Sequence, residues 1–248
     1  MKKIIVGVLS LVFLSLLYFN FIYEGKSSIQ NNEVTKNNEE TTETSESSTS
    51  SETKEDNEEQ KEKTSEPLVF NEDVIQERYD ENYKNNEPLI VDVVLPTYYS
   101  DSFINELENT FNSNSIQFNR IDIDVNSMEL SQLDVHENSD IVILSALQIQ
   151  DYNSEVLPDH DLQNVLDMYM SLLDDEKIAV VLSEVNVYDH INLENAIYDD
   201  QTYMNDYDYF YVDNSDVYLD DMYDDENNTL TKETETEVAK NIKQFFIQ

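Results

Sequence analysis

Two serines and one histidine are the residues of this chain whose types suit acyl-transfer chemistry. Ser100 and Ser102 follow one apolar run of the sequence, and His190 follows another. A serine hydroxyl attacks a carbonyl carbon only when a base takes its proton and donors stabilise the oxyanion. Ser102 also suits the N-cap of a helix beside Asp101, and His190 suits a solvated loop. The three residues are therefore alternative catalytic candidates, without an evident nucleophile–base pair.

Glycine is absent after Gly25, which restricts the kinds of active site that the chain can build. Phosphate-binding loops, dinucleotide-binding loops and nucleophile elbows use glycine for positive φ or for close backbone approach. Asn and Asp tolerate left-handed turn positions and are abundant here, so an α/β domain can still fold. The sequence therefore disfavours those standard sites, and we predict no cofactor.

Short apolar runs alternate with amphipathic segments through the second half of the chain. The runs expected to be strands are 89–95, 116–125, 140–145, 177–183 and 209–213; the expected helices are 70–83, 102–111, 161–173 and a last helix capped near Thr231. This alternation predicts an α/β fold, a three-layer αβα sandwich around a flavodoxin-like parallel sheet of order 2-1-3-4-5. Ligands of such sheets bind outside the carboxyl ends of the strands, where the strand order reverses.

The order of these elements and the residues at their ends resemble the SGNH (GDSL-type) hydrolases over roughly residues 89–248. That family closes with an Asp-x-x-His block, then Leu or Pro, Asn or Thr, a glycine, and a final helix with an early alanine. Residues 226–234 and Ala239 keep this spacing. In this resemblance Glu226 stands at the aspartate position, Thr229 at the catalytic histidine position and Thr234 at the glycine position.

Two further blocks of the family fall on strand ends of this chain. The Gly-x-Asn-Asp block would place Leu147 at the glycine and Ile149 at the oxyanion-hole asparagine. The Gly-Asp-Ser block would fall on Pro96-Thr97-Tyr98 or on Ser100-Asp101-Ser102. Thr229 is no base at neutral pH, and the Ile149 side chain donates no hydrogen bond. The resemblance thus implies SGNH architecture with a degenerate site at Thr97, Tyr98, Leu147, Ile149, Glu226 and Thr229.

The N-terminus predicts a membrane anchor. Lys2 and Lys3 precede an apolar run from Ile4 to Tyr23, which is long enough to cross a hydrocarbon core of roughly 30 Å. We expect residues 1–25 to be an uncleaved, single-pass signal-anchor with the rest of the chain outside the cell; a secretory signal cut near Glu24 is the alternative. Residues 26–67 are expected to be a disordered Ser/Thr/Glu-rich linker, and residues 68–248 one α/β domain.

The chain is strongly acidic, with 54 Asp and Glu against 14 Lys and Arg and a formal net charge of −40. This charge repels nucleic acid and anionic headgroups, which we exclude as ligands of the domain, and attracts basic proteins. The carboxylates of residues 199–226 match no EF-hand loop, so no metal site is predicted. Tyrosines are interleaved with these carboxylates, an arrangement that also suits the binding of sugar rings.

These observations favour a membrane-anchored, extracellular SGNH-hydrolase-like domain that is catalytically inactive and binds or scaffolds at the cell envelope. The expected partners besides the membrane are a cell-wall polymer or a basic protein. The alternative is a divergent esterase or acetyl-hydrolase that acts on cell-envelope polymers through a rebuilt serine site. A structural surface protein whose fold carries no functional meaning is a third hypothesis.

Overall fold

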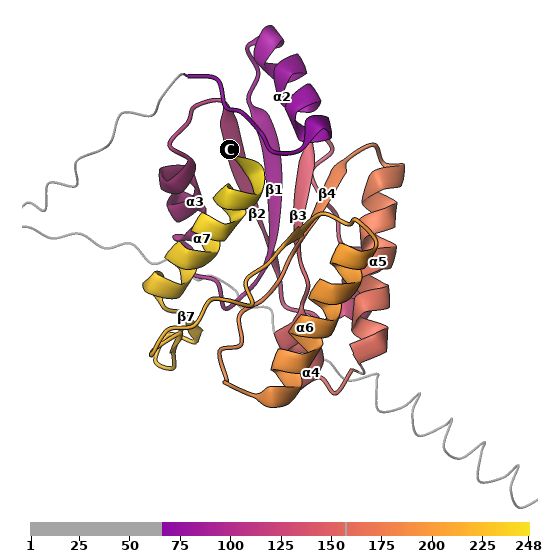
Figure 1. Cartoon of the computed structure of the whole chain (residues 1–248), viewed down its shortest axis with the longest axis vertical. Coiled ribbons are helices and arrows are strands. Elements are labelled where there is room, and N and C mark those ends of the chain that lie inside the picture. Colours follow the sequence, from indigo (N-terminus) through magenta and orange to yellow (C-terminus); the bar gives the residue numbers. More distant parts are fainter. Residues whose placement is uncertain (1–65, 157) are drawn as a thin grey trace, which may run out of the picture. The chain divides into compact units, whose positions relative to one another are not determined.

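A five-stranded parallel sheet lies at the centre of the residues that the structure, a computed structural model, describes: 66–156 and 158–248. The strands are β1 (Leu89–Pro96), β2 (Ile116–Ile123), β3 (Ile141–Ser145), β4 (Ile178–Leu182) and β5 (Tyr211–Val212). Their order is β2-β1-β3-β4-β5 and every pair is parallel, so the predicted order and direction are confirmed (Figure 1). The carboxyl ends of the strands therefore meet at one edge of the sheet, which we call the carboxyl edge.

Helices cover both faces of this sheet, as the three-layer prediction requires (Figure 1). Three helices pack against one face: α2 (Asp73–Asn85), α3 (Phe103–Phe111) and α7 (Lys232–Phe246). The 3-10 helix η1 (Ser127–Gln132) and α5 (Pro158–Asp174) pack against the other face. Two helices, α4 (Gln148–Asn153) and α6 (Ile191–Asp206), contact each other beside the carboxyl edge. An antiparallel hairpin of β6 (Tyr223–Asp224) and β7 (Thr229–Leu230) precedes α7.

Alternation along the central strand β1 divides the core into two parts. Val91 and Val93 are buried with the apolar face of α7, including Ile242, on one side of the sheet. Val94 is buried on the other side with Leu172 of α5. Each such side chain contributes about 1.5–3 kcal/mol through its removal from water. Burial on both faces explains why these strands are continuous apolar runs in the sequence.

The predicted strands and helices are present but differ from the observed ones at their ends, and further elements occur between them. The first helix begins at Asp73 and not at Phe70, because Phe70 forms a β-bridge with Ile247. Four observed elements were not predicted from the sequence: the 3-10 helix η1, the helices α4 and α6, and the β6–β7 hairpin. Much of the α6 surface carries acidic residues and exposed tyrosines, which obscures the apolar periodicity. The predicted anchor and almost all of the predicted linker lie outside the described residues. Within residues 66–156 and 158–248, no helix has the length and apolarity needed to cross a bilayer.

Left-handed backbone positions are supplied by residues other than glycine. Eight described residues have positive φ, and five of them are Asn or Asp: Asn86, Asn112, Asp189, Asp208 and Asn228. The other three are Leu147, Glu155 and Glu176.

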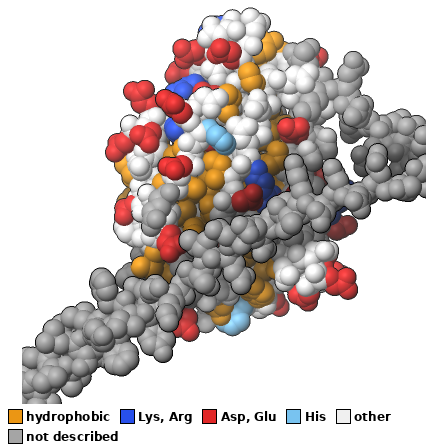
Figure 2. Space-filling model, turned by 180° about the vertical axis from the view of Figure 1, so that it is seen from behind, with side chains coloured by type: hydrophobic (Ala, Val, Ile, Leu, Met, Phe, Trp, Pro, Cys, Tyr) orange, Lys and Arg blue, Asp and Glu red, His pale blue; other side chains and the backbone are white. Residues whose placement is uncertain are grey.

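The surface also keeps the expected acidic character, because Asp and Glu side chains outnumber Lys and Arg on the face that Figure 2 displays.

Candidate functional site

A cavity of about 220 Å³ opens at the carboxyl edge of the sheet. Loops that follow β1 and β4 line it, together with helix α4 and the β6–β7 hairpin. The hairpin is fixed to the first of these loops, because the Leu230 backbone N–H donates to the Tyr98 carbonyl oxygen at 2.8 Å. The lining residues are Thr97, Tyr98, Ile149, Gln150, Asn153, Val187, Tyr188, Tyr223, Asn228 and Leu230. We call this space the edge cavity.

Three of the residues singled out from the sequence line the edge cavity: Thr97, Tyr98 and Ile149. Thr229 lies in the hairpin between two lining residues and does not itself line the cavity, while Glu226 is exposed in the turn of that hairpin. The fold therefore brings the segments that carry the predicted positions to one place. None of the described lining residues is a serine or a histidine, so the cavity wall supplies no nucleophile–base pair.

Leu147 is fully buried and occupies the position before α4, with φ 58° and ψ 25°. This is left-handed backbone, where a branched side chain is unfavourable by roughly 1–2 kcal/mol. The family to which the sequence is similar has glycine at this position. The backbone here has the conformation that suits glycine, although the chain places a large apolar side chain on it.

Glu184 is a buried carboxylate beside the edge cavity that sequence reasoning missed. It follows the fourth apolar run and is 1% exposed. Its oxygens accept hydrogen bonds from the Ser145 hydroxyl, at 2.9 Å, and from the Ile149 backbone N–H at the start of α4. Burial raises the pKa of Glu184 to about 7, even though these hydrogen bonds lower it. A charged residue directly after an apolar strand, at the carboxyl edge, was the available signal for it.

Tyr98 links this carboxylate to the cavity. Its ring stacks on Tyr99 with a centroid separation of 5.3 Å, and its hydroxyl is buried near Glu184. Burial first, and then the neighbouring Glu184 carboxylate, raise the pKa of Tyr98 well above its ordinary value. Tyr98 is therefore a neutral phenol at any physiological pH and cannot act as a base there.

Helix α4 is held by two further buried carboxyl groups. The Gln148 amide donates to Asp200 of α6 at 2.8 Å and accepts from the Glu184 backbone N–H at 3.0 Å. Asp151 accepts from the Ser127 backbone N–H at 2.7 Å. Burial raises the pKa of Asp200 to about 7 and also raises the pKa of Asp151. These carboxyl groups fix α4 in place and do not face a described basic side chain.

Ser100 and Ser102 lie on the α7 side of the carboxyl edge and outside the edge cavity lining. The Ser100 hydroxyl donates to Glu235 Oε2 at 2.7 Å and lies 2.9 Å from the Ser102 hydroxyl. Ser102 occupies the N-cap position of α3, as the sequence predicted. Its side chain, however, makes no capping hydrogen bond. Arg120 donates to the Ser100 carbonyl oxygen. Burial raises the pKa of Glu235, which the sequence analysis did not single out.

His190 does not contact either serine. Its side chain caps α6 by accepting from the Asn192 backbone N–H, and its ring lies against Tyr152, whose hydroxyl is 3.0 Å from Nδ1. His136 is placed elsewhere, where Nδ1 lies 2.9 Å from the buried Asp92 of β1. The structure therefore does not bring the three alternative catalytic candidates together. Among residues 66–156 and 158–248, no group of three or more His, Asp or Glu side chains is arranged to hold a metal ion.

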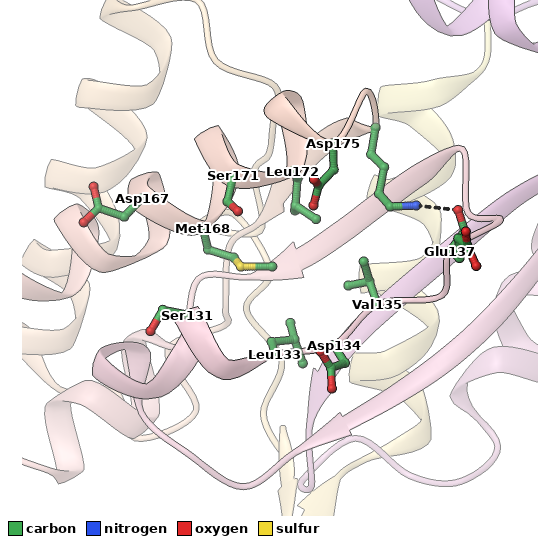
Figure 3. Close-up of a pocket in the computed structure, with 11 residues that line it drawn as sticks. Ser131, Leu133, Asp134, Val135, Glu137, Asp167, Met168, Ser171, Leu172 and Asp175 are labelled. Atoms are coloured by element: carbon green, nitrogen blue, oxygen red, sulfur yellow. Dashed lines mark hydrogen bonds between the residues drawn. The ribbon is translucent and has the colours of Figure 1, made fainter.

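A second cavity, of about 480 Å³, lies between α5 and the segment that follows η1 (Figure 3). Its lining includes the carboxylates of Asp134, Glu137, Asp167 and Asp175. Lys177 also lines it, but the ammonium group is directed to the carbonyl oxygens of His136, Glu137 and Ser139. These segments precede β3 and β4, so this cavity lies at the amino ends of the strands. Doubly wound sheets bind ligands at the opposite end, which favours the edge cavity as the candidate site.

No family model matches the sequence, and no curated protein matches it. Solved structures are similar to it at low identity. One is described as a lipolytic protein of the G-D-S-L family from Desulfitobacterium hafniense, and its sequence is 15% identical. The match covers 62% of this chain and 98% of that chain, with a TM-score of 0.47. Another is a GDSL-like lipase from Bacteroides thetaiotaomicron, whose sequence is 10% identical. The match covers 67% of this chain and 95% of that chain, with a TM-score of 0.46. Both neighbours carry a GDSL description in their names.

Proposed function

We propose that the domain binds a ligand at the edge cavity without hydrolysing it, and that it does so at the cell envelope. The observation that carries this proposal is the hydrogen bond from the Ile149 backbone N–H to the Glu184 carboxylate. An acyl hydrolase needs unoccupied donors aimed at the developing oxyanion. Here a donor at the start of α4 is taken by an internal carboxyl group. A negative charge near that place would oppose an oxyanion further.

The composition of the cavity wall supports the same proposal. Tyr98 is a neutral phenol, Thr229 stands where the resembled family has its histidine, and the described lining supplies no other base. The wall does supply amide, hydroxyl and aromatic groups, which are the groups that position a bound ligand. Location at the envelope rests on the apolar run from Ile4 to Tyr23 and on the lysines before it.

The alternative is a divergent esterase or acetyl-hydrolase with a rebuilt site. One observation favours it, the 2.7 Å hydrogen bond between the Ser100 hydroxyl and the buried Glu235 carboxylate. A carboxylate with a raised pKa can in principle accept a hydroxyl proton. However, both Glu235 oxygens are engaged by Ser100, one by its backbone N–H and one by its hydroxyl. That arrangement fixes the loop after β1 to α7, which is a structural role.

Two assays on the full-length chain separate these functions. Retention on purified cell-wall polymer measures binding, and turnover of small aryl and acetyl esters measures hydrolysis. We expect retention without turnover, and retention that falls several-fold in Tyr188→Ala, since Tyr188 lines the edge cavity. Tyr83→Ala is the matched control, because Tyr83 is also a partly exposed tyrosine but lies on α2. Ester turnover well above that of a buffer control, or equal retention of the two variants, would contradict the proposal.

A further inference from the structure

The edge cavity is uncharged on a protein that is otherwise acidic. None of its ten described lining residues is Asp, Glu, Lys or Arg, whereas the whole chain has 54 acidic residues. The wall instead combines three tyrosines with the amides of Gln150, Asn153 and Asn228. Amides and phenols both donate and accept hydrogen bonds, and aromatic faces pack against apolar C–H surfaces. This wall suits a neutral ligand that has many hydroxyl groups and an apolar face.

Two polar atoms of the cavity wall have no partner in the described part of the chain. The Gln150 side-chain oxygen is buried without a hydrogen bond. The Tyr98 hydroxyl is also buried, and it lies near Glu184 without forming a hydrogen bond of good geometry. A buried polar group without a partner costs about 1–3 kcal/mol. A ligand hydroxyl group that reached these atoms would remove that cost.

The three tyrosines of the wall lie near one another. Burial raises the pKa of Tyr223, and the neighbouring Tyr188 adds to the increase. Tyr188 also adds, after burial and the Glu184 carboxylate, to the raised pKa of Tyr98. The Tyr188 side chain is 49% exposed, so part of an aromatic side chain faces solvent at this cavity. Together these rings offer aromatic surface around a space that is small enough for a single ring-shaped unit.

A third cavity, of about 300 Å³, is lined in part by the same loop after β4 that lines the edge cavity. The short segment 186–188 contributes to both cavities: Asn186 lines the third cavity, and Val187 and Tyr188 line the edge cavity. The third cavity has a similar wall, with Asn195, Ser215 and two exposed side chains of α6, Ile191 and Tyr198. These two side chains are 60% and 62% exposed. Glu194 is its only described charged lining residue. We call it the α6 cavity.

We propose that the edge cavity and the α6 cavity are adjacent subsites for consecutive units of a neutral oligosaccharide that crosses the segment 186–188. This inference rests on the proposed function and adds the chemical class of its ligand. A sugar ring places C–H groups against aromatic faces and hydroxyl groups against amides, and both walls offer that combination. An acyl chain would leave the amides of the wall without partners, and an anionic polymer would be repelled by the surrounding carboxylates.

The test is calorimetric titration of the full-length chain with uncharged N-acetylglucosamine and glucose oligomers of one to four units. We expect at least one of the two series to bind, with an affinity that increases about tenfold or more from one unit to two or three. We expect Tyr198→Ala to remove this increase with oligomer length. Tyr207→Ala is the matched control, since Tyr207 is 63% exposed at the end of α6 and lines neither cavity. Unfolding temperatures of both variants check that the fold is intact.

Three results would overturn the inference: absence of binding in both series, an affinity that does not change with length, or equal losses in Tyr198→Ala and Tyr207→Ala. The proposed function fails in a different way. Retention on cell-wall polymer without oligosaccharide binding would leave the proposed function standing and reject the subsites. Oligosaccharide binding accompanied by ester turnover would retain the subsites and reject the non-hydrolytic function.

Discussion

The Glu184 carboxylate accepts a hydrogen bond from the Ile149 backbone N–H, although the two residues are 35 positions apart in the chain. The contact joins the end of β4 to the start of α4, at the edge where a ligand is expected. The positive end of a helix stabilises an anion, but burial disfavours the charged form of the carboxyl group. For Glu184 the effect of burial is larger, because the pKa is raised to about 7.

The first prediction follows from this raised pKa. Between pH 4.5, the ordinary value, and about pH 7, the folded chain keeps a proton on Glu184 that the unfolded chain loses. The contribution of Glu184 to stability is therefore fully present below pH 4.5, decreases as the pH rises, and is lost above about pH 7. The variant Glu184→Gln stays neutral at every pH, so its free energy of unfolding should decrease less over this range. At pH 8 the free energy of unfolding of Glu184→Gln should be roughly 1–3 kcal/mol higher than that of the unmodified chain.

Urea unfolding at a series of pH values measures this difference. Asp200→Asn should change the pH dependence in the same direction, because burial also raises the pKa of Asp200 to about 7. Asp199→Asn is the control, since Asp199 is exposed beside it in α6. If Glu184→Gln loses stability with pH as steeply as the unmodified chain, the raised pKa is wrong.

The second prediction concerns the left-handed residues. Glu176 is exposed after α5 and has φ 60°, so Glu176→Gly should raise the free energy of unfolding by about 0.5–1 kcal/mol. Glu176→Ala should give no such gain, because alanine keeps the Cβ. Leu147→Gly should instead destabilise the fold by about 1–3 kcal/mol, since the relief of strain is smaller than the loss of a buried side chain. Equal stabilities of Glu176→Gly and Glu176→Ala would refute the argument from strain.

The third prediction concerns the serines. A fluorophosphonate probe should leave the full-length chain unlabelled, because Ser100 and Ser102 lie outside the edge cavity and His190 contacts Tyr152 instead. A serine hydrolase of known activity serves as the positive control. Mass spectrometry would locate any adduct. Labelling of Ser100 or Ser102 that disappears in His190→Ala would establish a rebuilt active site and would end the non-hydrolytic interpretation.

The fourth prediction concerns topology. Lys2 and Lys3 before the apolar run favour an N-terminus inside the cell. Protease added to intact, wall-stripped cells should therefore remove the α/β domain and leave a small membrane-embedded fragment. Immunoblotting with an antibody against the domain measures the loss, and a cytoplasmic protein reports on cell integrity. Full protection of the domain would show that the predicted orientation is wrong.

The sheet could be predicted because its information is local. Runs such as Ile141–Ser145 and Ile178–Leu182 are buried on both faces and bounded by polar residues, so they read as strands without knowledge of their neighbours. The fold also placed the loops after β1 and β3 at one edge, as the strand order requires. These inferences needed only hydrophobicity, length and the handedness of crossovers.

The chemistry of the edge cavity could not be predicted in the same way. Glu184 is one acid among 54, and its burial depends on Ser145 and Ile149, which precede it by 39 and 35 positions. Asp200 and Glu235 lie in acidic stretches where sequence alone distinguishes no member from its exposed neighbours. Tertiary contacts select which carboxyl groups are buried, so the sequence predicted the edge of the sheet at which the cavity lies but not the carboxyl groups buried beside it.

The β-bridge between Phe70 and Ile247 places the beginning and the end of the described domain next to each other. Backbone hydrogen bonds from Asn71 to Phe246 and from Gln248 to Val69 fix the same junction. Because α7 runs from the hairpin at the carboxyl edge back along the sheet, this junction lies at the far end of the domain from the edge cavity (Figure 1). The described part of the chain therefore begins on the side of the domain opposite the edge cavity. A short loop joining the two ends of the described domain should therefore permit circular permutation.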